Sequence, residues 1–325
     1  MENNFKFWRR FFSYLAVAAI LFFLFRQFLV SWPKITDFDL SFNYFYLIFS
    51  FLLLDMSIFG LALVWNYILR SLDPQNKLSN LAALKIYIYS EFAKYLPGAL
   101  WPIVGKVYIG AREGISKKNL AISSFLDSFL PFLISILIGM VLAPIELIGS
   151  AWVYYILIIS VLIIFLAFFP KFFWSFINWG LKLVGRAKIA DSHSLSRKKT
   201  FIVLFVYFII NLIGGLAFFF FINSVVKLPA EKIFSVVGIY NLAIAMGVAA
   251  VFAPSGLGVR EGAMSLLLSF YLPSGVAILI SFVARLWFSL AEILLLLLAF
   301  LINRFQFKKI ILNASNESIA NELKK

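Results

Sequence analysis

Long uninterrupted runs of apolar residues recur along the chain and are separated by short polar or charged segments. Six of these runs contain about 20 residues or more, the length that an α-helix needs to cross the ~30 Å hydrocarbon core of a membrane. They predict membrane-spanning helices over residues 11–30, 42–69, 119–142, 151–170, 200–222 and 276–302. A membrane β-barrel would instead show short segments of alternating polarity. The pattern therefore predicts an all-α, polytopic helical membrane protein.

Two further apolar regions, 81–110 and 233–271, are interrupted by helix-breaking residues. The breaks are Pro97 and Gly98 in the first region, and Pro254, Gly256 and Gly258 in the second. Irregular backbone at membrane depth is tolerated where it is buried in protein or lines a polar cavity. We therefore expect two broken helical hairpins. Helix N-termini near Gly98 and Gly258 would offer free N–H groups to an anion such as phosphate. The alternative is a plain tight turn between two packed helices.

The basic residues predict how the chain is oriented. The 325 residues include 29 Lys and Arg against 15 Asp and Glu, a formal net charge of +14. The cations cluster at the ends of apolar runs, as the positive-inside rule describes, so nucleic acid is not expected as a partner. The rule predicts that both termini lie in the cytoplasm. On this assignment the first hairpin enters from the cytoplasmic side and the second from outside.

The chain then divides into two halves that follow one plan of span, span, broken hairpin and span. The halves start from opposite sides, and we expect each hairpin to be followed by the same tripeptide, residues 112–114 and 260–262. Such inverted-topology repeats place a substrate site near the membrane midplane, between discontinuous helices. We therefore predict one integral membrane domain over residues 1–325, with half-repeats over 1–146 and 147–303 and a cytoplasmic tail over 304–325.

Charged residues within or beside the apolar runs are the candidate substrate-binding residues. A charge at the bilayer centre costs about 2.5–3.5 kcal/mol on insertion scales, so such residues should face the protein interior. The candidates are Asp55, Glu91, Lys94, Lys106, Arg112, Asp127, Arg260, Glu261, Arg285 and Glu292. Arg285 and Glu292 share one helix face and could form a structural ion pair. Glu91 and Lys94 could also be only a local pair. Otherwise we expect Asp55, Glu91, Asp127, Arg260 and Arg285 to line one polar cavity.

Two counts limit the chemistry. The chain has no cysteine, and its one histidine, His193, lies in a basic polar loop. Thiolate chemistry, cysteine-ligated metals and disulfides are therefore excluded, and a histidine-based metal or proton-relay site is not expected. No cofactor or metal is predicted.

At two segments the chain resembles the lysylphosphatidylglycerol synthase/flippase membrane-domain family. The matching residues are Lys94, Tyr95, Pro97, Gly98, Trp101, Gly105, Lys106 and Tyr108, followed by Pro254, Gly256, Gly258, Arg260 and Glu261. Lys106 stands where the family often has Arg, and Asp127 where it usually has Glu, and both keep the sign of the charge. The cytoplasmic aminoacyl-transfer domain of the two-part members of the family has no counterpart in these 325 residues. We therefore expect a stand-alone membrane domain that is not an enzyme.

The resemblance implies an integral protein of the prokaryotic cytoplasmic (inner) membrane. It further implies a lipid translocator that moves an anionic phospholipid or a lipid-linked sugar across this membrane. The expected partners are this lipid, the surrounding membrane lipids, and an envelope glycosyltransferase or lipid-modifying synthase. Two alternatives stay open: a membrane scaffold or accessory protein for such a glycosyltransferase, and a membrane enzyme that acts on a lipid phosphate. The scattered Asp and Glu residues do not form an acidic metal cluster, which counts against the enzyme.

Overall fold

The computed structural model describes residues 42–95, 100–142 and 195–322, except for residues 77 and 252, together with positions 22, 26, 155, 158 and 160. Every regular element in this part of the chain is a helix. The α-helices are α2 (Tyr44–Leu72), α3 (Asn80–Glu91), α4 (Trp101–Arg112), α5 (Lys117–Val141), α8 (Arg197–Asn223), α9 (Ile233–Ala249), α10 (Val259–Leu268) and α11 (Ser274–Glu322). The 3₁₀ helices are η1 (Phe92–Tyr95), η4 (Ala230–Lys232) and η5 (Pro254–Gly256).

Four of the six predicted spans are described, and each is a helix long and apolar enough to cross a membrane. They are α2, α5, α8 and the segment Ser274–Leu298 of α11. The predicted spans 11–30 and 151–170 lie outside the described residues except for the five single positions given above. A fifth candidate span, Ala230–Ala249, combines η4 and α9. The prediction of an all-helical integral membrane protein is therefore confirmed.

Polar side chains mark where three of these helices begin. Asn43 Oδ1 accepts a hydrogen bond from the Tyr46 amide, 3.2 Å away, at the start of α2. Ser79 Oγ accepts one from the Ala82 amide at the start of α3, and Ser196 Oγ one from the Lys199 amide at the start of α8. Each cap satisfies an amide that has no partner within its own helix. The sequence thus places the helix starts at polar residues beside the apolar runs.

The two broken hairpins are present but unequal. In the first, α3 and α4 contain 12 residues each, about 18 Å of helix, so neither can cross the membrane. In the second, α10 contains only 10 residues, whereas η4 and α9 together reach the length of a span. Of the four hairpin helices, α9 is thus the one that reaches the length of a span, together with η4.

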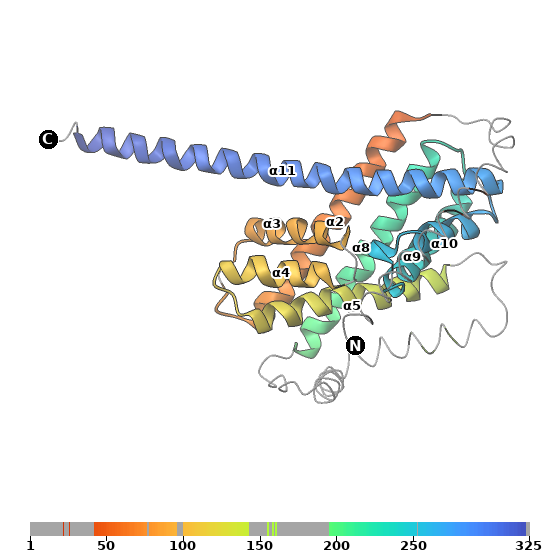
Figure 1. Ribbon diagram of the computed structural model, residues 1–325, viewed down its shortest axis with the longest axis horizontal. Coiled ribbons are helices and arrows are strands. Elements are labelled where there is room, and N and C mark those ends of the chain that lie inside the picture. The colour runs from red at the N-terminus through yellow and green to blue at the C-terminus, as the bar shows by residue number, and fades with distance from the viewer. Residues whose placement is uncertain are drawn as a thin grey trace, which may run out of the picture.

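The hairpins approach the core of the helical bundle from opposite ends (Figure 1). In this view α3 and α4 lie at the left and α9 and α10 at the right, while the antiparallel pair α2 and α8 crosses the middle. α2 packs more extensively on α8 than on any other described helix, and η1 contacts η5. The breaks of the two hairpins therefore meet inside the protein. α11 runs along one side of this bundle and continues beyond it.

The helix contacts occur in matching pairs. α3 packs on α4 as α9 packs on α10, and α4 packs on α5 as α10 packs on α11. The crossed contacts also correspond, since α5 packs on α9 and α11 packs on α3. This is the packing that an inverted repeat predicts. The boundary between residues 146 and 147 lies outside the described residues, so the division into half-repeats stays a prediction.

The repeated tripeptide, in contrast, does not mark equivalent positions. Residues 112–114 lie at the C-terminal end of α4, whereas residues 260–262 lie in the first turn of α10. The expectation that both hairpins are followed by this tripeptide is therefore wrong. The physical reason is that Gly114 (φ 79°) ends a helix, while Glu261 caps the start of one.

Aromatic side chains join α11 to the central pair of helices. The Trp287 ring stacks on Phe221 of α8 with ring centroids 4.8 Å apart, and its Nε1 donates a hydrogen bond to Ser50 Oγ of α2 over 3.1 Å. In a membrane the hydrophobic effect does not drive helices together, because lipid tails are equally apolar. Close packing and interhelical hydrogen bonds of this kind stabilise the helix contacts instead. They fix the face of α11 that carries the charged residues described next.

Candidate functional site

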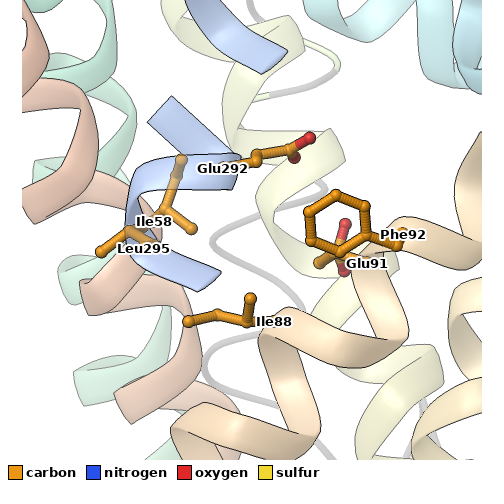
Figure 2. Close-up of a pocket in the computed structure, with 6 residues that line it drawn as sticks. All are labelled: Ile58, Ile88, Glu91, Phe92, Glu292 and Leu295. Carbon is orange, nitrogen blue, oxygen red and sulfur yellow. The ribbon is translucent and has the colours of Figure 1, made fainter. Parts of the chain in front are cut away.

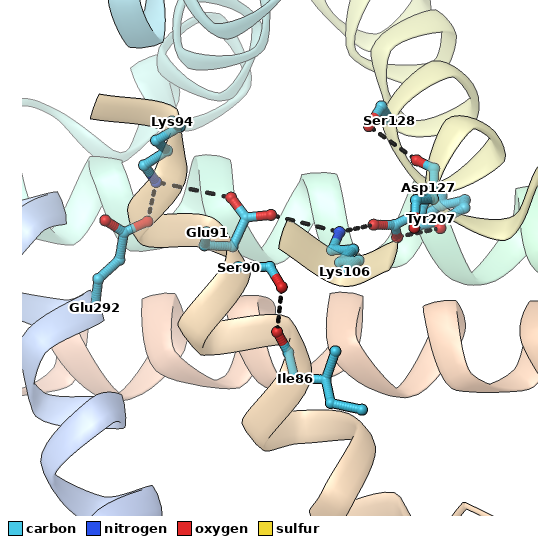
Figure 3. A network of polar contacts seen from close by, with 10 residues as sticks. Ile86, Ser90, Glu91, Lys94, Lys106, Asp127, Ser128, Tyr207 and Glu292 are labelled. Carbon is cyan, nitrogen blue, oxygen red and sulfur yellow. Dashed lines mark hydrogen bonds and ion pairs between the residues drawn. The ribbon is translucent and has the colours of Figure 1, made fainter. Parts of the chain in front are cut away.

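Charges of alternating sign form a chain through the inside of the protein (Figure 3). It runs from Glu292 on α11 to Lys94 on η1, Glu91 on α3, Lys106 on α4 and Asp127 on α5. Tyr207 on α8 ends it by donating a hydrogen bond to Asp127 Oδ1 over 2.7 Å. Three carboxylates thus share two ammonium groups. We call these five charged residues the carboxylate–lysine chain.

The most buried link is the Lys106–Asp127 pair. Lys106 Nζ lies 2.6 Å from Asp127 Oδ2, and both side chains are only 2% exposed. The Lys106 ammonium also lies 3.9 Å from the centroid of the Tyr87 ring, a cation–π contact. Charges this deep are expensive unless they are paired and hydrogen-bonded. Asp127 meets that condition through Lys106 and Tyr207 together.

The other end of the chain is looser. Lys94 donates a hydrogen bond to Glu292, and its Nζ lies 3.9 Å from Glu91 Oε2. Lys106 Nζ lies 3.5 Å from the second oxygen of Glu91. Glu91 therefore lies between two ammonium groups without a close contact to either. The local pair Glu91–Lys94 that the sequence left open exists, but each of its members has a second partner of opposite charge.

A second cluster forms at the break of the other hairpin. Arg285 Nη1 lies 3.5 Å from Glu261 Oε1 and donates a hydrogen bond to the Ser255 carbonyl oxygen over 3.2 Å. Glu261 Oε2 accepts a hydrogen bond from the Gly258 amide over 2.7 Å. Arg285 and Glu292 thus each contact a residue of another helix, and the possible ion pair between the two stays a prediction.

The start of α10 carries its own carboxylate. Glu261 Oε2 accepts a hydrogen bond from the Gly258 amide and lies at the positive end of the helix dipole. One of the N–H groups expected to be free near Gly258 is therefore satisfied within the protein. The other expected helix start lies near Gly98, and α4 begins three residues later at Trp101, while Gly98 and Pro97 lie outside the described residues.

Arg260 differs from the other charges, because Glu261 and Glu292 act on this buried cation only from beyond ion-pair distance. Arg260 is 8% exposed, and it forms no ion pair among the residues that the structure describes. The guanidinium carbon lies 4.7 Å from the Phe288 ring centroid and 5.9 Å from that of Tyr240. Lys94 Nζ lies 4.9 Å from the same Phe288 ring. Phe288 therefore contacts one cation from each hairpin.

A small pocket opens beside the carboxylate–lysine chain (Figure 2). Its lining combines the side chains of Glu91 and Glu292 with Phe92 and the aliphatic residues Ile58, Ile88 and Leu295. The free space suffices for about one water molecule. The pocket is therefore much smaller than a lipid headgroup in this conformation, and carboxylates rather than cations reach into it.

The structure brings most of the predicted site residues into these two clusters but leaves two of them apart. Arg112 is exposed at the end of α4, where its guanidinium stacks on Tyr108. Asp55 lies in α2 with its Oδ1 buried and without a hydrogen-bond partner among the described residues. The expectation of one cavity lined by Asp55, Glu91, Asp127, Arg260 and Arg285 is therefore not met in this conformation.

Aromatic residues are the part of the site that the sequence did not reveal. Tyr207, Tyr240 and Phe288 hold Asp127 and Arg260, yet each belongs to an apolar run rich in similar residues. Only Phe288 carried a signal, because it lies three residues after Arg285 and four before Glu292 on one face of α11. Among the described residues, no three His, Cys, Asp or Glu side chains are grouped so that they could hold a metal ion.

Comparison with known protein families identifies the family of this chain. The sequence model of the family described as "Lysylphosphatidylglycerol synthase TM region" matches residues 10–291. The matched range contains both hairpins, the carboxylate–lysine chain except for Glu292, and Arg260. No curated protein matches the chain.

Proposed function

The chain belongs to the lysylphosphatidylglycerol synthase TM-region family, and from this premise we propose that it is a lipid translocator for an anionic headgroup. It acts in the prokaryotic cytoplasmic membrane, with both termini in the cytoplasm. The substrate is an anionic phospholipid or a lipid-linked sugar phosphate whose tails stay in the bilayer. The protein moves the lipid and does not alter its covalent bonds.

Arg260 carries this proposal. A guanidinium in the membrane interior is expensive unless it has a partner, and its planar fork matches a phosphate. Arg260 is buried where the breaks of the two hairpins meet, and it lacks a carboxylate partner among the described residues. A lipid phosphate would supply the missing anion. The neighbouring rings of Phe288 and Tyr240 keep the guanidinium in place while that position is empty.

Entry of a headgroup requires the two hairpins to separate. The pocket beside the carboxylate–lysine chain has room for about one water molecule in this conformation. The link between Lys94 and Glu292 joins the first hairpin to α11, and the contacts of Arg285 join α11 to the second hairpin. Exchange of these polar contacts would let each hairpin move against α11. A polar path would then replace the hydration that a phosphate loses in hydrocarbon.

The experiment compares purified protein and variants in liposomes that contain a headgroup-labelled phosphatidylglycerol or polyprenyl-phosphate sugar. A quencher added outside reports how fast the label crosses. The wild-type chain should accelerate crossing over protein-free liposomes. Arg260→Gln should lower the rate at least tenfold, because it removes the charge, and Arg260→Lys should keep part of it, because it keeps the charge but loses the fork.

Arg112→Gln is the matched control. It removes the same charge from an exposed position of α4, so the crossing rate should not change. Thermal unfolding in detergent shows whether each variant is folded. Equal rates for wild-type and empty liposomes with every lipid tested would contradict translocation. Co-purification of an envelope glycosyltransferase would then favour the scaffold function instead.

A further inference from the structure

Among the residues that the structure describes, the charges are balanced over the two clusters together but not within either one. The carboxylate–lysine chain has three carboxylates and two ammonium groups. The cluster at the second hairpin has two guanidinium groups, those of Arg260 and Arg285, and the single carboxylate of Glu261. The excess negative charge of the first cluster is therefore compensated by the excess positive charge of the second. Phe288 contacts Lys94 of the first cluster and Arg260 of the second, so the two clusters adjoin at this ring.

We propose that an anion bound at Arg260 makes the carboxylate–lysine chain take up one proton, so that headgroup and proton cross the membrane together. This inference rests on the proposed function and adds its energy source. An anion bound to the Arg260 guanidinium neutralises the positive charge that compensates the third carboxylate of the carboxylate–lysine chain. An uncompensated carboxylate in a low-dielectric interior is unstable as an anion, and protonation removes the cost.

Glu91 is the carboxylate that accepts the proton. Asp127 has an ammonium at 2.6 Å and a hydroxyl at 2.7 Å, and Glu292 accepts a hydrogen bond from Lys94. Glu91 has its two ammonium groups at 3.5 and 3.9 Å, so its charge is held least tightly. Its side chain is 23% exposed, against 7% for Glu292 and 2% for Asp127. It also lines the pocket, where a water molecule could deliver the proton.

Most other titratable groups around Glu91 have contacts of their own, and the ring of Tyr87 on α3 lies against the Lys106 ammonium. Lys94 and Lys106 lie on η1 and α4, and Glu292 and Arg285 on α11. Tyr207 of α8 already donates to Asp127, and Tyr240 of α9 lies against Arg260. Glu261 of α10 is held by Arg285 and the Gly258 amide. Asp55 of α2 contacts none of these charges and provides an internal control.

The proton balance is simple. A proton from the aqueous phase adds to one carboxylate oxygen of Glu91, Lys94 and Lys106 stay protonated, and no bond of the lipid changes. By linkage, the proton and the anion each raise the affinity for the other by the same factor. An anionic lipid should therefore bind more tightly as the pH falls, and its binding should withdraw protons from the solution.

The test measures binding of a fluorescent short-chain phosphatidylglycerol to the purified full chain in detergent. Its phosphodiester keeps one charge between about pH 5.5 and about pH 7.5, so a change in affinity belongs to the protein. We expect affinity about tenfold higher at the lower pH, and uptake of about one proton per bound lipid in weakly buffered solution containing a pH dye. Equal affinity at the two pH values, or no proton uptake, would overturn the inference.

Variants assign the effect to a residue. Glu91→Gln should bind the lipid with the same affinity at both pH values and without proton uptake. Glu292→Gln should also lose the pH dependence of binding, because it too reduces the number of carboxylates from three to two. This variant provides the test if Glu91→Gln does not fold. Asp55→Asn and His193→Asn should keep the full pH dependence. Loss of the linkage in either control, or its survival in both glutamine variants, would overturn the assignment.

Two outcomes separate this inference from the proposed function. If the lipid binds and crosses the liposome membrane at a rate that does not depend on an imposed pH gradient, translocation is supported and proton coupling is contradicted. Absence of any lipid binding removes both. With coupling, an inward pH gradient accelerates wild-type crossing in the direction of proton flow, and Glu91→Gln abolishes that dependence.

Discussion

The sequence predicts which charged residues face the protein interior, but it does not predict which residues they pair with. Charges inside apolar runs have to face the protein interior, which identified Lys106, Asp127 and Arg285 as interior residues. The sequence does not say which carboxylate meets which cation, because partners on different helices have no fixed spacing. The sequence therefore suggests Glu292, on the same helix, as a partner of Arg285, and does not reveal Glu261 of α10, which lies within ion-pair distance of it.

The Lys106–Asp127 pair should contribute strongly to stability. Lys106→Met leaves the Asp127 carboxylate buried with only the Tyr207 hydroxyl, so we expect a loss of about 3–5 kcal/mol in the free energy of unfolding. The double variant Lys106→Met/Asp127→Leu removes both charges and should lose much less than the single one. Thermal unfolding in detergent measures both changes. A single variant as stable as the wild type would show that the carboxylate is not buried as described.

Among the elements, the breaks of the hairpins were predictable because proline and glycine have few structural roles inside apolar runs. The lengths of the surrounding helices were not. α9 joins η4 to reach the length of a span, since nothing between residues 230 and 249 interrupts the helical hydrogen bonds. The start of α10 was also predicted at Gly258, but its cap is internal, because Glu261 folds back on the Gly258 amide.

Gly256 should be indispensable to the second break. Its φ is +65°, and a Cβ there would lie 2.6 Å from the Gly247 Cα, against the backbone of α9. Gly247 in turn lies against Arg260, so a displaced break would move the guanidinium. Gly256→Ala should therefore destabilise the protein by more than the 1–2 kcal/mol typical of left-handed strain and slow lipid crossing.

Gly262→Ala is the control at the level of the element. A Cβ on Gly262, inside α10, meets no atom within 4 Å. Because alanine favours a helix over glycine, this variant should be as stable as the wild type or more stable by about 0.5–1 kcal/mol. Thermal unfolding compares the two glycines directly. Equal effects of both substitutions would show that η5 does not pack on α9 in the membrane.

For the whole molecule, the charge pattern along the chain predicted a topology that agrees with the arrangement of the described helices. The connections 73–79 and 113–116 and the start of α8 lie at one end of the bundle, and the connection 269–273 lies at the other (Figure 1). The first hairpin, which the sequence predicts to enter from the cytoplasmic side, lies at the first end. Which end faces the cytoplasm is still a prediction, because no membrane orients the helices.

Single cysteines decide the orientation, since the native chain has none. Ser116, before α5, and Ser269, after α10, follow corresponding helices of the two hairpins and are both exposed. Ile115 would be a poor choice, because it is buried in the core. In intact cells an impermeant maleimide should label Ser269→Cys, whereas Ser116→Cys should react only after the membrane is opened. Because the two sites have equal access in the folded protein, a difference in labelling reports the membrane and not burial. Labelling of both from one side would contradict the inverted repeat and, with it, entry of the hairpins from opposite faces.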